Sequence, residues 1–313
     1  MLAPMAGITD WPFRLQCKRQ GADVLVTEMI SAMGLLQSPK GNLAYKHLLS
    51  FHEEETGLIA QLFGKDPAMM GEAAAILDAL PQYAGIDINF GCPAPKVTGS
   101  GGGSALMKDL PLSRRIVASV RRAVKKPLSV KMRLGWDPSS VNVIDFAKMC
   151  QDEGADLVTV HGRTRQQQYS GKADWAMITK VREALDIPLI ANGDVFTPGD
   201  ALDILSVTGA AGLAVGRGAL GNPWIFREIN QALSGETPAR PDPDTVLKTA
   251  LAHLDDMIAF KGEYRALIEM RKHFAWYLKG SPGAARTRAL INTTEDLDAL
   301  RTIVRSHFEV PAH

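Results

Sequence analysis

Cysteine is scarce in this chain and follows none of the spacings that hold zinc or form a disulfide framework. Among 313 residues there are three cysteines, Cys17, Cys92 and Cys150, an odd number without a C-x-x-C pair. This count argues against a disulfide-stapled fold and against a zinc site. Histidines and carboxylates also lack ligand spacing, so we expect no metal. No secretory signal is visible, and a reducing, cytoplasmic location is therefore expected.

Long apolar runs and a strong charge of one sign are missing as well. No uninterrupted apolar run approaches the ~20 residues of a membrane span, so we expect no membrane partner. The formal net charge is +1, which by itself predicts no polyanionic ligand. The hydrophobic content of 46% is enough for a large core.

Positive charge is nevertheless concentrated in two segments. In the segment 261–288, which contains Arg271 and Lys272, basic residues outnumber acidic ones and are interleaved with aromatics, a mixture that suits RNA. RNA binding and an ordinary solvated helix face are about equally favoured there. A second cluster at 114–126 lies on a predicted amphipathic helix, where a solvated face is the simpler interpretation.

Short apolar runs alternate with helical stretches, which is the pattern of repeated βα units. Eight strands are predicted, at 2–4, 24–27, 58–62, 86–89, 128–132, 157–160, 188–191 and 213–215. Helices are predicted between them, at 66–79, 111–124, 141–153, 174–185 and 198–207. Eight units indicate a TIM (β/α)₈ barrel. An open doubly wound sheet would need a G-x-G-x-x-G turn after the first strand, and the sequence has none there.

The chain is longer than a barrel requires, because a (β/α)₈ barrel uses roughly 250 residues. The segment 234–244 is rich in proline, glycine and polar residues, which predicts a linker. Only helical periodicity follows it. We therefore expect a barrel over residues 1–240 and a small all-helical domain over 241–313.

Polar residues stand at the carboxyl ends of the predicted strands, where barrel enzymes carry their chemistry. Singly, each has an ordinary structural explanation, as a paired core residue or a turn. Together, their burial would cost desolvation free energy that nothing offsets unless the rim binds a ligand. The rim residues are Pro4, Met5, Ala6, Gln61, Asn89, Lys131, Arg133, His161, Arg163, Asn192, Gly193, Asp194, Gly216 and Arg217.

Flavin mononucleotide (FMN) is a ligand that matches this rim. Glycine-rich ends of the seventh and eighth strands are where TIM barrels commonly bind phosphate, and Arg217 would add a charged hydrogen bond. Lys131 and Gln61, facing the barrel axis, would meet a flat heteroaromatic ring, with the cation beside the position where negative charge gathers on reduction.

Cys92 lies at the end of the fourth predicted strand, between Gly91 and Pro93, where no regular element continues. A free cysteine is more often a small buried hydrophobe. Here a loop dense in glycine follows it, which favours close approach of the backbone to a ligand. The residues alone leave two roles open, proton donor and nucleophile.

Six motifs closely resemble those of the tRNA-dihydrouridine synthases. They are A-P-M-A-G-I-T-D at 3–10, D-I-N-F-G-C-P at 87–93, V-K-M-R-L-G-W at 130–136, H-G-R-T at 161–164, A-N-G-D at 191–194 and V-G-R-G-A-L-G-N-P-W-I-F at 215–226. The resemblance covers about residues 1–230 and continues more weakly through the helical tail. It implies an FMN-bearing TIM barrel joined to a helical tRNA-binding domain. The implied reaction is reduction of the C5–C6 double bond of selected uridines, with NADPH as the reductant of the flavin.

The resemblance also implies roles for individual residues. Cys92 would be the general acid. The residues expected to hold FMN are Pro4, Met5, Ala6, Gln61, Lys131, His161, Asn192, Gly193, Asp194, Gly216 and Arg217. The uridine position, the subfamily and the preference between NADPH and NADH are left open, and a monomer is expected.

The chemistry is consistent with these roles. A thiol with a pKa near 8.5 stays mostly protonated at neutral pH and donates a proton without prior activation. The target base of a folded tRNA has to be flipped out of its stack. We expect Asn89 to read the uracil edge, Arg133 or Arg163 to hold a phosphate, and Arg271 and Lys272 to contact the tRNA.

Three other functions compete with this one. A small-molecule flavin dehydrogenase, of the dihydroorotate or dihydropyrimidine type, would explain the barrel and the cysteine but not the basic tail. A non-catalytic RNA-binding protein would explain the tail but not the rim. A lyase that uses Lys131 as a Schiff base is conceivable from the position of that lysine alone.

Overall fold

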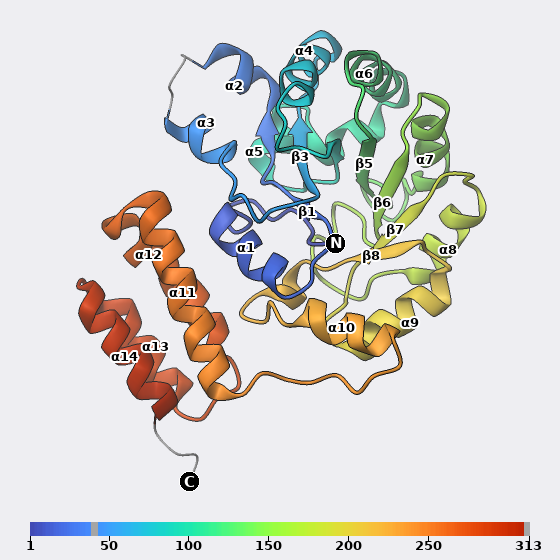
Figure 1. Cartoon of the computed structure of the whole chain (residues 1–313). Helices are drawn as coiled ribbons and strands as arrows, with labels where there is room; N and C mark the ends of the chain where they lie inside the picture. Colours follow the sequence, from blue (N-terminus) through green and yellow to red (C-terminus); the bar gives the residue numbers. More distant parts are fainter. Residues whose placement is uncertain (39–42, 310–313) are drawn as a thin grey trace.

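The computed structural model describes residues 1–38 and 43–309, and its centre is a ring of parallel strands surrounded by helices (Figure 1). This is the TIM barrel that the sequence predicts. The strands pair in the order β1-β3-β4-β5-β6-β7-β8, and β2 pairs with β3 off this path. Their bounds are β1 Leu25–Val26, β2 Ile30–Ser31, β3 Leu58–Phe63, β4 Gly85–Phe90, β5 Leu128–Arg133, β6 Leu157–His161, β7 Leu189–Asn192 and β8 Gly212–Ala214.

The first predicted strand, at 2–4, is present only as a single bridging residue. Leu2 forms parallel bridges to Leu25 on one side and to Val215 on the other, and so closes the ring between β1 and β8. Pro4 has no backbone N–H to continue the ladder, and the chain then turns toward α1. The prediction of a three-residue strand was therefore wrong in length but correct in place.

The second barrel strand is interrupted. Both β1 and β2 pair with β3, β1 through Leu25 and Val26 and β2 through Ile30 and Ser31. The sequence predicted only the first of these two pieces. The remaining predicted strands coincide with β3 to β8 to within one or two residues at their ends.

Helices form the outer layer, and several of them begin at a side-chain cap. Asp66, Asp109 and Asp174 each accept a backbone N–H from the residue three positions on, at the starts of α4, α6 and α8. The outer helices are α1 Trp11–Arg19, α2 Ala32–Gln37, α3 Leu43–Leu48, α4 Pro67–Asp78, α5 Pro95–Gly99, α6 Leu110–Ala123, α7 Val143–Asp152, α8 Trp175–Glu183, α9 Pro198–Thr208 and α10 Ile225–Leu233, with short 3₁₀ turns η1 Gly103–Lys108 and η2 Arg217–Ala219.

Alternation along each strand divides the core into two parts. In β4, for example, Ile86, Ile88 and Phe90 belong to the large apolar cluster between the strands and the helices. The intervening residues, Asp87 and Asn89, face the interior of the barrel. In each strand, alternate residues therefore face inward and supply the polar side chains of the site, while the residues between them pack in the apolar core.

Within the described residues up to 309, four helices follow the barrel and form a compact group beside α1, orange to red in Figure 1. They are α11 Pro243–Lys261, α12 Glu263–Tyr277, α13 Ala284–Thr293 and α14 Leu297–Glu309. Their apolar cluster includes Leu254, Met270 and Phe274, and Trp224 from the barrel side packs into it. No helix among the described residues is both long and apolar enough to span a bilayer.

The helical group is fastened to the barrel close to the loop that follows Leu2. Lys261 Nζ lies 2.7 Å from Asp10 Oδ2, and Asp10 also caps α1. Lys272 Nζ donates to the carbonyl oxygen of Gly7 at 2.5 Å. The segment 5–10 is thus held from outside by two lysines of the helical group.

Candidate functional site

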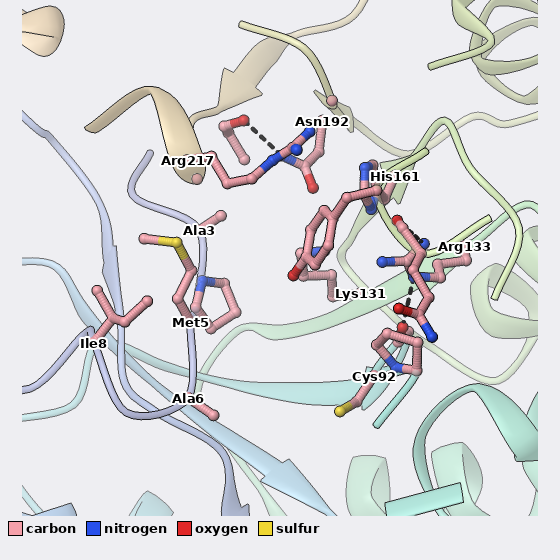
Figure 2. Close-up of a pocket in the computed structure, with 18 of the residues that line it drawn as sticks. Ala3, Met5, Ala6, Ile8, Cys92, Lys131, Arg133, His161, Asn192 and Arg217 are labelled. Carbon is pink, nitrogen blue, oxygen red and sulfur yellow. Dashed lines mark hydrogen bonds between the residues drawn. The ribbon is translucent and has the colours of Figure 1, made fainter. Parts of the chain in front are cut away.

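A cavity of about 560 Å³ opens at the carboxyl ends of the barrel strands. Thirteen of the predicted residues line it: Pro4, Met5, Ala6, Asn89, Cys92, Lys131, Arg133, His161, Asn192, Gly193, Asp194, Gly216 and Arg217. Figure 2 shows Met5, Ala6 and Ile8 on one side and Cys92, Lys131, Arg133 and His161 on the other. One wall is therefore mainly apolar, and the facing wall is polar and carries positive charge.

Strand register aligns the polar wall. Arg133 pairs with His161 across β5 and β6, and His161 pairs with Asn192 across β6 and β7. Lys131 lies two residues before Arg133 and therefore one layer deeper on the same face. Because neighbouring strands are in register, residues far apart in sequence meet in one row at the rim.

The backbone around Cys92 is held by three side chains. Asn89 Oδ1 accepts the N–H groups of Gly91 at 3.0 Å and of Cys92 at 2.8 Å. Arg133 Nε donates to the carbonyl of Gly91 at 2.8 Å, and the Ser104 hydroxyl donates to the carbonyl of Cys92 at 2.9 Å. A loop without regular structure thus presents its cysteine in one defined position.

The Cys92 thiol is half-buried, and burial raises its pKa. An N–H bond from Ala94 and the charges of Arg133 and Lys131 act in the opposite direction without cancelling that effect. The thiol is therefore protonated at neutral pH. A protonated thiol suits a proton donor better than a nucleophile, which has to be a thiolate.

Lys131 and His161 face the cavity without partners. Neither side chain makes a hydrogen bond with another described residue. Desolvation, assisted by the nearby Arg133, lowers the pKa of Lys131 to about 8. Desolvation together with the surrounding cations lowers the pKa of His161 well below its ordinary value. At neutral pH, Lys131 is mostly charged and His161 is neutral.

The far end of the cavity is suited to an anion. Arg217 lines it, and the backbone N–H groups of Gly193, Gly216 and Arg217 donate to no acceptor within residues 1–38 and 43–309. Gly218 allows close packing here, because a Cβ at this position would lie 2.2 Å from the carbonyl oxygen of Val195. Free N–H groups beside a guanidinium form the usual surroundings of a bound phosphate.

Four predicted site residues are placed elsewhere. Gln61 is completely buried behind the cavity and hydrogen-bonds with Asp87 and Asn89. Arg163 is also buried; its guanidinium binds Asp194 and the carbonyl oxygens of Ser170 and Gly171. The structure therefore uses Arg163 to hold a loop, because a cation this deeply buried needs partners within the protein.

Arg271 and Lys272, which we expected to contact RNA, make contacts within the protein. Arg271 Nη2 donates to the carbonyl oxygen of Thr294 at 2.7 Å. Lys272 donates to Gly7, as described above. These contacts engage one donor of each side chain and leave other donors for a ligand.

Two exposed aromatics at the cavity were not predicted from the sequence. Tyr169 and Phe196 both line it, and the Arg217 guanidinium lies 4.6 Å and 5.5 Å from their ring centroids. Both lie in loops that follow predicted strands, Tyr169 five residues and Phe196 two residues beyond the preceding motif. The sequence feature that could have identified them is an aromatic residue in a polar loop after a barrel strand.

A metal centre is not formed by any cluster of histidine, cysteine and carboxylate side chains in the part of the chain that the structure describes.

Comparison with known proteins gives a consistent result. A sequence model of the family described as dihydrouridine synthase (Dus) matches residues 1–310. The chain is 41% identical over 313 residues to tRNA-dihydrouridine synthase B of Xanthomonas axonopodis pv. citri, covering 99% of this chain and 92% of that protein. It is 42% identical over 311 residues to tRNA-dihydrouridine synthase B of Pseudomonas aeruginosa, covering 98% and 92%.

Solved structures share the fold at low sequence identity. A 2-naphthoyl-CoA reductase complex matches with a TM-score of 0.56 and 12% identity, covering 78% of this chain and 48% of that chain. A 6-hydroxypseudooxynicotine amine oxidase of Pseudomonas geniculata N1 also matches with a TM-score of 0.56, at 11% identity, covering 79% and 50%. At this identity the likeness concerns the barrel alone.

Proposed function

The chain belongs to the dihydrouridine synthase family, and from this membership we propose that it reduces uridines of tRNA to dihydrouridine. The overall reaction consumes one NADPH and one proton for each uridine and releases NADP⁺. The observation that carries the proposal is the place of Cys92, whose backbone is held at the wall of a cationic cavity and whose thiol pKa is raised by burial. The relatives do not favour a small-molecule dehydrogenase.

FMN is the proposed cofactor, and the residues of the cavity fit it. The unpartnered N–H groups of Gly193, Gly216 and Arg217, together with the Arg217 guanidinium, suit its phosphate. The unpartnered ammonium of Lys131 suits the electron-rich part of its ring. We propose that Pro4, Met5, Ala6, His161, Asn192 and Asp194, which line the cavity, complete the site. When bound, FMN supplies the hydride that NADPH provides, and this hydride goes to C6 of the uracil ring.

Cys92 supplies the second hydrogen. Its S–H bond breaks as a C–H bond forms at C5 of uracil, and the sulfur keeps the electron pair as a thiolate. The Ala94 N–H and the cations Arg133 and Lys131 stabilise that thiolate, because these groups oppose the rise in the thiol's pKa. A proton from water then restores the thiol.

Asn89 is proposed to orient the base, and Arg133, which lines the cavity, to hold a phosphate. Asn89 Oδ1 is already occupied by two backbone N–H groups, and one hydrogen of its Nδ2 goes to Gln61. The second Nδ2 hydrogen remains available to donate to a uracil carbonyl. Such a base has to be unstacked and flipped before it reaches the cavity.

Catalysis and tRNA binding are proposed to lie in different segments of the chain. We assign catalysis to residues 1–240 and tRNA binding to residues 241–313, with Arg271 and Lys272 among the contacts. The position of Lys272 against Gly7, next to the cavity residues Met5 and Ala6, supports a tRNA surface continuous with the cavity. Phosphate contacts by such cations would make binding weaken as salt rises.

A spectroscopic experiment separates this function from the small-molecule alternative. Purified protein loaded with FMN is reduced by NADPH without oxygen and then mixed with unmodified tRNA, with orotate or with free uracil. We expect tRNA alone to restore the oxidised flavin spectrum rapidly. Rapid reoxidation by orotate or uracil, with none by tRNA, would reject the proposed function.

A further inference from the structure

A chain of hydrogen bonds runs through the barrel interior and ends at the Cys92 backbone. Ser129 Oγ lies 2.5 Å from Asp87 Oδ1, and Gln61 Nε2 donates to Asp87 Oδ2 at 2.7 Å. Asn89 Nδ2 then donates to Gln61 Oε1 at 2.8 Å. Asn89 Oδ1 accepts the N–H groups of Gly91 and Cys92.

Strand pairing explains why these residues meet. Gln61 of β3 is the register partner of Asp87 in β4, and Asp87 is the partner of Ser129 in β5. Asn89 follows Asp87 by two residues, so both side chains face the barrel interior. Burial is nearly complete: Gln61 is 0% exposed, and Asp87 is 4% exposed.

Donor and acceptor chemistry fixes the direction of the chain. At one end, the backbone N–H groups of Gly91 and Cys92 can only donate, so the Asn89 oxygen has to face them. At the other end, the Asp87 oxygen that meets Gln61 Nε2 acts as an acceptor, so the Gln61 oxygen has to face Asn89. Both ends therefore impose the same orientation on the two carboxamides, and Asp87 supplies the acceptor for Gln61 Nε2.

We propose that Asp87 is a positioning residue for Cys92, acting through the carboxamides of Gln61 and Asn89. It touches neither the cavity nor the proposed substrate, since it is absent from the cavity lining. Its carboxyl group holds Gln61, Gln61 holds Asn89, and Asn89 holds the two peptide groups on either side of Gly91, the second of which ends at Cys92. Without Asp87, Gln61 loses the anchor that turns its oxygen toward Asn89.

The consequence for catalysis rests on the proposed function. Proton transfer to C5 requires the thiol to be aligned with the base, and even a small displacement of the thiol strongly slows such a reaction. Asp87 should therefore affect the step that involves Cys92. It should leave flavin reduction by NADPH unchanged, because that step does not use the thiol.

The test compares Asp87→Ala, Asp87→Asn and Ser129→Ala in the full-length protein. The asparagine retains one oxygen acceptor for Gln61 and offers an N–H to Ser129, so it should rescue the chain of bonds. Ser129→Ala removes a partner of Asp87 on the side away from Cys92 and is the matched control for loss of a buried hydrogen bond. Alkylation of Cys92 by iodoacetamide, followed by peptide mass spectrometry, reports directly on its loop.

We expect Asp87→Ala to speed alkylation of Cys92 about fivefold, the effect of losing roughly one hydrogen bond. Asp87→Asn and Ser129→Ala should alkylate like the wild type. In FMN-loaded protein, Asp87→Ala should slow flavin reoxidation by tRNA while the rate of reduction by NADPH stays constant.

Two results would overturn the proposal. One is an unchanged alkylation rate in Asp87→Ala together with a loss of thermal stability equal to that of Ser129→Ala, which would mean a purely structural role. The other is an equal loss of FMN content and of NADPH-driven reduction, which would mean that Asp87 serves the cofactor. If no variant, wild type included, reduces tRNA but the alkylation pattern holds, the proposed function fails and the positioning role stands.

Discussion

Asp194 Oδ2 lies 2.8 Å from Nη2 of Arg163, and this ion pair joins the loops that follow β6 and β7. The Arg163 side chain is 2% exposed, and that of Asp194 is 22% exposed. The other carboxylate oxygen of Asp194 lies 3.3 Å from Arg217 Nη2. One carboxylate thus connects a buried structural arginine with an arginine of the cavity.

Replacing Asp194 by asparagine should destabilise the protein by about 3 kcal/mol, because the Arg163 charge would remain buried without its counter-ion. Asp194 has a φ of 60°, and asparagine tolerates this region as well as aspartate, so the change isolates the charge. Arg217→Ala, which removes the more exposed partner, should cost less than about 1 kcal/mol. Urea unfolding of the three proteins measures both effects, and equal losses would contradict this assignment.

The ion pair between Asp194 and Arg163 should also make the free energy of unfolding depend on pH in acid. Burial favours the neutral form of Asp194, but the bonds from Arg163 and Ala173 outweigh it and lower the pKa of the carboxyl below 3.8. The stabilisation of the folded state by the Asp194 carboxylate is therefore complete above the unfolded pKa, which is near 4. It is lost as the pH falls through the lower pKa of the folded state. Urea midpoints measured between about pH 6 and pH 3 should show a smaller decline for Asp194→Asn than for the wild type.

Two glycines at the anion end of the cavity should respond differently to alanine. At Gly218 a Cβ would lie 2.2 Å from a backbone oxygen, so Gly218→Ala should lower the thermal midpoint strongly. At Gly216 the nearest atoms would be at 3.8 Å, in ordinary contact, and the new methyl group would point toward cavity residues. Gly216→Ala should therefore keep most of its stability and lose FMN affinity, measured by quenching of flavin fluorescence. Normal FMN binding by Gly216→Ala would contradict a phosphate site at this end of the cavity.

FMN binding should weaken as Lys131 loses its proton. Because the pKa of Lys131 is lowered to about 8, the ammonium is present below that pH and disappears above it. FMN affinity should be constant from about pH 6 to 7.5 and then fall by up to tenfold for each pH unit. Lys131→Met should bind more weakly with a flat profile. A profile in Lys131→Met that still falls at pH 8 would assign the titration to another group.

Lys261 should contribute to stability through its buried contact with Asp10. Its side chain is 13% exposed and that of Asp10 4%, so Lys261→Met leaves a buried carboxylate without its cation and should cost about 2 kcal/mol. Lys248→Met breaks an exposed pair with Asp244 and is the matched control, with an expected loss much smaller than that of Lys261→Met. Thermal unfolding of both variants measures the difference, and equal losses would refute the role given to Lys261.

The pH dependence of this contact has the opposite sign to that of Asp194. Burial alone would lower the pKa of Lys261, but Asp10 and Glu269 together raise it above 10.5. The contribution is complete below the unfolded pKa of about 10.4 and is lost only as pH rises through the raised folded value. Wild type and Lys261→Met should therefore converge in stability only in strongly alkaline solution.

Much of the site could be predicted from the sequence because strand alternation and register are visible there. Apolar residues at every second position of β5 place Lys131 and Arg133 on one face, and parallel pairing brings them to His161 and Asn192. Inferring eight βα units was enough to place these ends at one rim. The motifs that resemble the tRNA-dihydrouridine synthases added the roles.

What the sequence did not reveal are the partners of each side chain. Arg163 and Arg133 both stand near strand ends, yet Asp194 and the loop carbonyls bury Arg163 while Arg133 reaches the cavity. Gln61 was expected to face the ligand, but its register partner Asp87 turns it into a buried chain of hydrogen bonds. Which partners a polar side chain contacts depends on residues far apart in the chain, and local sequence patterns do not reveal these contacts.

The most direct test of the account is the reaction of unmodified tRNA with NADPH in D₂O, followed by mass spectrometry of the digested nucleosides. Wild type should form dihydrouridine that carries one deuterium from solvent at C5, delivered by the exchanged thiol of Cys92. Cys92→Ala, loaded with FMN to the same extent, should be slower by about 10²-fold or more. Equal rates in the two proteins, or no dihydrouridine from a wild-type protein that binds FMN and oxidises NADPH, would contradict the account.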